Sequence, residues 1–292
     1  MQSAQRLINI KIAKAYRTIS FEASCVMTRV PPIGTVITGK VQLYKIKHRL
    51  ENSEQACNMP LPDNKWPRPA RRVTISETSE LTTFPIEIYT GGSKDGGKVG
   101  AGVAIHSNKQ LVKQCKYKLH NCCSNNQAEQ IAILKALEQL PKLEDPTGRI
   151  AAIFTDSKVT IDSFKNHATH SFLIEEIRNK VWHLSTLNWT IHFRWVKAHS
   201  GIEGNEEAHK LTKEAAQDLD DQNIVFDRIP VTTVTNEINK KGLIQWQGQW
   251  NSTEKGAACR SFFPVLEQRL KMKIPITPEF TAIITGHGKT KS

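Results

Sequence analysis

Four short segments between residues 86 and 218 limit what this chain can fold into more than any other feature. Two of them close apolar strands and two open helices. In chain order they are YTGGS at 89–93, NQAE at 126–129, FTDS at 154–157 and GNEEAHKL at 204–211. This alternation of strand-closing and helix-opening signals predicts an α/β domain in this part of the chain.

Hydrophobic periodicity fills in the elements between these segments. Three hairpin-linked strands are expected first, followed by a helix that Ser124 caps and Pro141 ends, and then by a buried strand. Two helices, a strand and a last helix after Gly204 complete the series. The expected ranges are 86–90, 99–106, 111–119, 124–140, 150–155, 157–164, 171–184, 189–196 and 204 onward.

These motifs and their order resemble the type 1 ribonuclease H family. The resemblance implies a ribonuclease H-like fold, which is α/β with a mixed five-stranded sheet and flanking helices, here with N- and C-terminal extensions. The implied partner is an RNA/DNA hybrid, whose RNA strand the family cuts endonucleolytically with two divalent ions, Mg²⁺ or Mn²⁺. Glu129 and Asp156 match two of the family's four acidic ligands, which makes them the expected metal-binding and catalytic residues.

The other two acidic positions of the family are occupied by Gly91 and His209. Glycine offers no side-chain oxygen, and an imidazole is a poor ligand for Mg²⁺. Asp95, four residues along an extended strand, substitutes only if the turn folds back. We expect His209 to be an unconstrained, exposed helix residue and two-metal hydrolysis to be impaired, so whether the chain is an enzyme stays open.

Other positions match the family's catalytic loop and substrate groove. His199, in HSGIEGN, corresponds to the loop histidine that assists turnover, although a histidine beside glycine is often only a loop residue. The expected substrate-binding residues are Ser93, Ser124, Asn125, Asn126, Gln127 and Asn205. The residues around Ser124 can also serve simply as a helix cap. The structural alternative for Glu129 is a solvated residue in the first turn of a helix, and that for Asp156 is a helix cap. Trp182, Trp189 and Trp195 are expected to pack in the core.

Charge and composition support a nucleic-acid partner. The net charge is +12, and residues 1–60 hold nine basic residues against three acidic ones. Neither a secretory signal nor a membrane-spanning apolar run is recognisable, so we expect an intracellular protein without a membrane partner, in either nucleus or cytoplasm. The six cysteines lack metal-ligand spacing and are expected as free thiols without disulfide partners.

The flanking segments resemble parts of a retroelement polyprotein. Residues 5–23 look like the end of a reverse transcriptase from non-long-terminal-repeat retrotransposons of the R1 or Jockey-like group, and TGHG at 285–288 resembles their downstream region. The expected organisation is a reverse transcriptase remnant at 1–59, a Pro/Arg-rich linker at 60–83, the ribonuclease H domain at 84–218 and a truncated extension at 219–292. Alternatives are a catalytically silent nucleic-acid-binding module, a relic without function, or another nuclease or integrase of the same fold.

Overall fold

The chain divides into two compact units in a computed structural model. Residues 57–231 form one, here called the central unit; residues 1–56 and 232–292 together form the other, the terminal unit. The structure describes residues 1–47, 73–75, 83–143, 147–166, 168, 171–218 and 223–287. Most of the predicted linker at 60–83, together with Cys57 and Gly288, lies outside these ranges.

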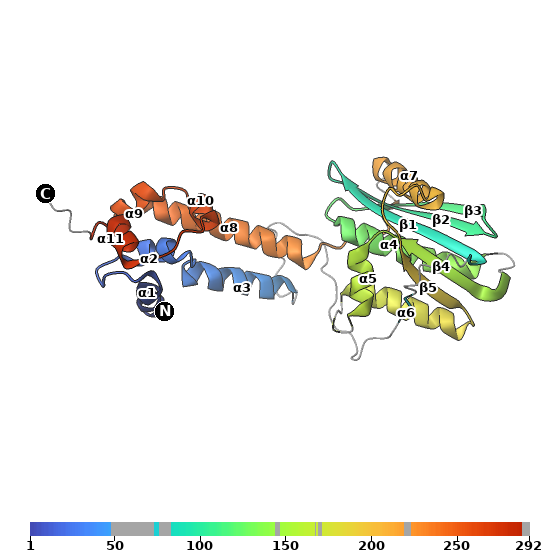
Figure 1. The fold of residues 1–292 in the computed structure, drawn as a ribbon, viewed down its shortest axis with the longest axis horizontal. Coiled ribbons are helices and arrows are strands. Elements are labelled where there is room, and N and C mark those ends of the chain that lie inside the picture. Colours follow the sequence, from blue (N-terminus) through green and yellow to red (C-terminus); the bar gives the residue numbers. More distant parts are fainter. Residues whose placement is uncertain are drawn as a thin grey trace. The chain divides into compact units, whose positions relative to one another are not determined.

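The central unit is built on one five-stranded sheet (Figure 1). Its strands are β1 Ile86–Asp95, β2 Lys98–Ser107, β3 Gln110–Leu119, β4 Ile150–Thr155 and β5 Thr190–Trp195, in the order β3-β2-β1-β4-β5. The first three strands are antiparallel, as hairpins must be, whereas β4 and β5 run parallel to β1. The prediction of a mixed five-stranded α/β fold is therefore confirmed.

Helices cover both faces of this sheet (Figure 1). One face carries α4 Asn125–Gln139, α5 Lys158–Lys165 and α6 Phe172–Thr186, and the opposite face carries α7 Glu203–Gln217. Two short 3₁₀ turns, Leu140–Lys142 and Thr147–Arg149, lead from α4 to β4. Proline lacks an amide hydrogen and Pro141 falls in the first turn, so α4 ends where the sequence predicts.

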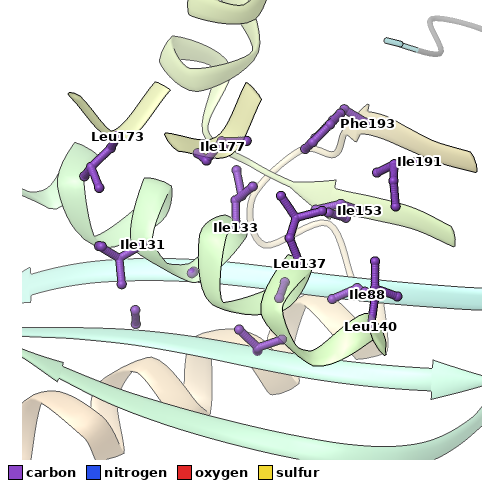
Figure 2. Packing of buried hydrophobic residues seen from close by; sticks show 14 of the residues in the cluster. Ile88, Ile131, Ile133, Leu137, Leu140, Ile153, Leu173, Ile177, Ile191 and Phe193 are labelled. Atoms are coloured by element: carbon purple, nitrogen blue, oxygen red, sulfur yellow. The ribbon is translucent and has the colours of Figure 1, made fainter. Parts of the chain in front are cut away.

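The main core lies between the sheet and the α4–α6 layer (Figure 2). Ile131, Ile133 and Leu137 of α4 belong to one buried cluster with Ile88 and Ile153 of the two central strands, and Leu137 lies beside Ile153. All five side chains are buried, and burying each such side chain contributes about 1.5–3 kcal/mol. This packing fixes the start of α4 against the ends of β1 and β4.

Two glycines allow helices to approach the sheet backbone directly. A Cβ at Gly92 of β1 would lie 2.2 Å from the backbone nitrogen of Glu129, on the α4 face. A Cβ at Gly102 of β2 would lie 2.3 Å from the carbonyl oxygen of Ala208, on the α7 face. Since neither position has room for a larger residue, the glycines set how closely α4 and α7 bring their side chains to β1.

The terminal unit is helical and combines both ends of the chain. It contains α1 Gln2–Ala13, α2 Phe21–Thr28, α3 Ile33–Lys47, α8 Val231–Ser252, α9 Ala257–Phe262, α10 Leu266–Lys271 and α11 Pro278–Thr285. Met27 from the first part packs with Trp250 and Phe263 from the second. The indole N–H of Trp250 donates to the carbonyl oxygen of Phe263 at 2.8 Å. The segment after residue 218, in which the sequence suggests only local structure, therefore contributes to a shared core.

None of the helices in the described part of the chain is long and apolar enough to span a bilayer. The five cysteines that the structure describes, Cys25, Cys115, Cys122, Cys123 and Cys259, are free.

Candidate functional site

The candidate site lies at the sheet edge where the pairing of β1 with β4 ends. Thr90 pairs with Thr155, and the next residues along the two parallel strands are Gly91 and Asp156. Because parallel strands end at a common edge, positions separated by 65 residues in sequence become neighbours. Two of the four motif positions therefore meet through strand register alone.

Glu129 reaches this edge from the first turns of α4. It is buried, and the backbone N–H of Gly92 donates to its carboxylate. Its Oε2 has no hydrogen-bond partner among the described residues. Burial, reinforced by the charge of nearby Asp156, raises the pKa of Glu129 well above its ordinary value. The alternative interpretation of Glu129 as a solvated residue in the first turn of a helix is therefore wrong.

His209 reaches the same edge from α7, on the opposite face of the sheet. Its Nε2 lies 3.1 Å from Oδ2 of Asp156, and its side chain is only 16% exposed. The contact lacks the geometry of a hydrogen bond, since the same Nε2 is without a hydrogen-bond partner among the described residues, so it is an ion contact whenever the imidazole is protonated. The expectation of an exposed, unconstrained His209 is therefore wrong.

The space in front of Gly91 is taken up by α7. A Cβ at Gly91 would lie 3.2 Å from Oγ1 of Thr212 and 3.3 Å from Nδ1 of His209. The Thr212 hydroxyl donates to the carbonyl oxygen of Gly91 at 3.0 Å. The sequence motifs do not single out Thr212, although its position three residues after His209 places both on one face of a helix. Gly91 and His209, the two positions where the resemblance leads us to expect acids, are therefore neighbours in space.

Asp95 does not lie where it could take the place of an acid at position 91. The ladder between β1 and β2 continues without interruption from Gly91, opposite Gly102, to Asp95, opposite Lys98. The strand stays extended over these residues, and the turn does not bring Asp95 back to the site.

His199 lies in the loop before α7 with a positive φ of 51°. Its ring stacks on that of His209 with centroids 5.2 Å apart, and its Nδ1 lies 3.6 Å from Oε2 of Glu206. The side chain is 71% exposed. The predicted loop histidine therefore lies beside the site and is open to solvent.

The polar residues at the start of α4 divide into structural and exposed groups. Ser124 and Gln127 form a reciprocal capping box, and the Gln127 amide also donates to the carbonyl oxygen of Arg228 at 3.0 Å. Asn125 and Asn126 are exposed, and Oδ1 of Asn125 accepts from the backbone N–H of Lys94. Of these four residues, the two asparagines face solvent in a way that suits contact with a substrate.

Ser93 and Asn205 flank the site in different environments. Ser93 is partly buried on β1, opposite Gly100 of β2. Asn205 is buried in the first turn of α7, and neither its Nδ2 nor its Oδ1 has a hydrogen-bond partner among the described residues. Buried amides are normally paired, so Asn205 retains unused hydrogen-bonding capacity near the site.

Trp195 is a second residue that the sequence misplaces. Only Trp189 of the three tryptophans expected in the core is buried; Trp182 and Trp195 are each 50% exposed. The indole N–H of Trp195 donates to the carbonyl oxygen of Asp156 at 3.1 Å. This bond places an exposed aromatic ring next to the acid, because β5 ends beside β4.

The donor set does not fit two Mg²⁺ ions. Mg²⁺ requires oxygen ligands in near-octahedral geometry. Gly91 supplies none, and the Asp156 carboxylate has the imidazole of His209 beside it, with Nε2 of His209 lying 3.1 Å from Oδ2 of Asp156. Within the described ranges, no three His, Cys, Asp or Glu side chains form a group that could hold a metal ion.

The sheet order and the helix layers define a ribonuclease H-like fold, with Glu129 and Asp156 at one edge of the sheet. The RNase H family model matches residues 84–217. Ribonuclease H of Trichodesmium erythraeum (strain IMS101) is 32% identical over 151 residues, which cover 46% of this chain and 90% of the relative. Ribonuclease H of Francisella tularensis subsp. novicida (strain U112) is 31% identical over 143 residues, 45% and 90% respectively. The chain therefore belongs to the ribonuclease H family, which uses divalent metal ions.

Solved structures similar to this chain include RNase H1 from the halophilic archaeon Halobacterium salinarum NRC-1. It is 21% identical with a TM-score of 0.36, and the match covers 44% of this chain and 96% of that one. Another is LC11-RNase H1 in complex with an RNA/DNA hybrid, which is 24% identical with a TM-score of 0.36 and a coverage of 45% and 96%.

Proposed function

We propose that this chain binds RNA/DNA hybrids through its ribonuclease H domain and that its hydrolysis of the RNA strand is impaired. The observation that carries the proposal is the contact between His209 and Asp156, 3.1 Å apart where the family places two acids. A protonated imidazole there offsets the charge of Asp156 and repels a cation, and a neutral one offers Mg²⁺ a poor ligand. With Gly91 contributing no oxygen and an imidazole at position 209, two carboxylates, those of Glu129 and Asp156, remain where the family places four.

The substrate side of the site is better preserved than the metal side. Exposed Asn125 and Asn126 at the start of α4 can donate to and accept from the 2′-hydroxyls that a hybrid displays in its minor groove. Trp195 offers an exposed ring next to Asp156, and His199 stacks on His209 beside it. These groups bind and orient a nucleic acid without needing a metal. A catalytically silent hybrid-binding module is therefore the second candidate function, favoured by the same His209 contact.

The proposal extends to the origin of the chain. The similarity of residues 5–23 and 285–288 to retrotransposon polyproteins supports a retroelement source, with a reverse transcriptase remnant at 1–59, a linker at 60–83, the ribonuclease H domain at 84–218 and an extension at 219–292. Loss of function after such an origin, leaving a relic, is one outcome of the test below.

The test is cleavage of a labelled RNA/DNA hybrid by the full chain in Mg²⁺ and in Mn²⁺. We expect no cleavage by the natural sequence and cleavage by the double variant Gly91→Asp/His209→Asp, because two carboxylates restore the donor set. The matched control is Gly91→Asn/His209→Asn, which adds side chains of the same size without charge and is expected to stay inactive. Hybrid affinity is measured for every variant by fluorescence anisotropy.

The outcomes distinguish an impaired nuclease from a silent binding module and from a relic. Cleavage by the natural chain in Mg²⁺ would contradict the proposed impairment. Hybrid binding without cleavage by any variant would favour the silent module. If no variant binds the hybrid although each retains its helical circular dichroism, the result would favour a retroelement relic without function.

A further inference from the structure

The net positive charge of the chain is concentrated outside the ribonuclease H domain. The terminal unit holds 18 lysines and arginines against 7 aspartates and glutamates, a net charge of +11. The central unit holds 22 against 21, a net charge of +1. Attraction to phosphate depends on unbalanced positive charge, so the candidate site lies in the unit that provides almost none of it.

Several cations of the central unit also have internal partners. Lys116 lies 3.3 Å from Glu214 and Lys135 lies 2.9 Å from Glu138. The ammonium group of Lys94, next to the candidate site, donates to the carbonyl oxygens of Asn121 and Cys123 at 2.8 Å each. These contacts reduce what the central unit can offer to a phosphate backbone.

The terminal unit has a concave surface lined by positive and hydroxyl groups. A cavity of about 550 Å³ is bordered by Arg6, Lys255 and His287, together with Thr18 and Ser20. Glu22 is the one acidic residue of its lining in the described part of the chain. The Arg6 guanidinium donates to the carbonyl oxygens of Arg17 and Ile19, and the Thr18 hydroxyl contacts Nε2 of His287, so exposed Lys255 is the cation of this lining best placed to meet a phosphate.

An aromatic surface borders this cavity. Tyr16 is 55% exposed, and its ring stacks on that of His287 with centroids 5.3 Å apart and planes 23° apart. Lys14 and Arg17, both exposed, stand on either side of Tyr16 in the sequence. Aromatic rings interleaved with basic side chains are typical of surfaces that hold nucleic acid without reading its sequence.

We propose that the terminal unit is a second nucleic-acid-binding surface, which holds phosphates through Lys14, Arg17 and Lys255 and stacks a base on Tyr16. This inference rests on the proposed function only in taking nucleic acid as the partner. It assigns the salt-dependent, sequence-independent part of the affinity to the terminal unit and leaves the preference for a hybrid to the central unit.

The experiment compares two charge-neutralised forms of the full chain. The test variant is Lys14→Gln/Arg17→Gln/Lys255→Gln; the matched control is Lys109→Gln/Lys142→Gln/Lys213→Gln, three exposed lysines of the central unit. Dissociation constants for an RNA/DNA hybrid of about 20 base pairs and a DNA duplex of the same sequence are measured from about 50 to about 300 mM salt. A protein that neutralises three fewer phosphates shows a slope of log affinity against log salt about 2.7 smaller in magnitude.

We expect the slope of log affinity against log salt to be smaller in magnitude by about 2 to 3 in the test variant, on both duplexes. The ratio of hybrid affinity to DNA affinity should stay unchanged. The control should keep the slope of the natural chain. An independent variant, Tyr16→Leu, should weaken binding of a single-stranded oligonucleotide by about 5- to 150-fold, the equivalent of one stacked base.

The inference fails if both triple variants change the slope equally or if neither does. It also fails if the natural chain binds anionic phospholipid vesicles but no nucleic acid. A slope that depends on the terminal unit without any preference for the hybrid would uphold the inference and contradict the proposed function. A preference for the hybrid, together with a slope that the test variant leaves unchanged, would contradict the inference and support the proposed function.

Discussion

Positions 91 and 209 are neighbours, so a side chain introduced at one of them meets the side chain at the other. Restoring an acid at position 91 alone would place its Cβ against the imidazole of His209 and the hydroxyl of Thr212, both within 3.3 Å. Contacts this short require the neighbouring side chains to move. A change at position 209 removes one of these two contacts, and the restoration experiment uses both substitutions because each of them adds a carboxylate.

The titration of Glu129 gives a prediction for stability. Its pKa is raised in the folded protein by burial and by Asp156, so ionisation favours the unfolded chain. The stability associated with the protonated form is present below the unfolded pKa, near 4.5, and is lost as pH rises through the raised pKa. We expect Glu129→Gln, which cannot ionise, to unfold at a higher temperature than the natural chain at about pH 8 and at a similar temperature at about pH 4.

Thermal unfolding followed by circular dichroism between these two pH values measures this difference. Glu176→Gln, on a partly exposed position of α6, is the control and should leave the pH profile unchanged. A difference between Glu129→Gln and the natural chain that grows toward acidic pH would contradict the assignment.

At the level of helices and strands, the neighbouring glycines Gly91 and Gly92 of β1 determine how the two helices approach the site. Adjacent residues of β1 point to opposite faces, so Gly91 faces α7 and Gly92 faces α4. The edge is therefore approached from both sides, with Glu129 arriving from one helix and His209 from the other. A larger residue at Gly91 should therefore displace groups of α7, and a larger residue at Gly92 should displace α4.

The substitutions Gly92→Ala and Gly91→Ala should differ sharply in their cost. The Cβ that Gly92→Ala adds would meet the backbone of α4 at 2.2 Å, which cannot be relieved by a side-chain rotation. We expect a loss of about 3 kcal/mol or more in the free energy of unfolding, because α4 has to shift. The Cβ that Gly91→Ala adds would have side-chain atoms as its two nearest neighbours, at 3.2 and 3.3 Å, and we expect a loss within about 1 kcal/mol.

Urea denaturation of the two variants measures these free energies. Equal losses would mean that α4 yields as easily as the side chains of α7, contrary to the close packing described above.

At the scale of the whole molecule, two separate hydrophobic cores predict two unfolding transitions. Trp250 and Phe193 are both fully buried, the first in the terminal unit and the second in the central unit. Large-to-small substitutions of such residues in a core cost about 3–5 kcal/mol. We expect Trp250→Ala to lower one calorimetric transition and Phe193→Ala to lower the other. A shift of both transitions by the same amount in either variant would show that the units unfold together.

The sequence predicts the central unit well because its strands and helices are marked locally. Alternating residues, Ser124 and Pro141 set the limits of β2, β3, β4 and α4 to within about one residue, whereas β1 continues to Asp95, beyond its predicted end at Thr90. The terminal unit is not predicted, because α8 buries Trp246 and Trp250 against helices more than 200 residues earlier in the chain. The sequence misplaces His209 and Trp195 for a related reason: their environment depends on which strand ends beside which, and residue type alone does not reveal this.

The discontinuous terminal unit has a consequence for synthesis of the chain. Met27 cannot meet Trp250 until 223 further residues have been made, which takes roughly 10 to 45 s at ribosomal rates of about 5–20 residues per second. During that interval the central unit can already fold, while α1 and α2 keep their apolar sides uncovered. We therefore expect a chaperone to bind this N-terminal segment during synthesis.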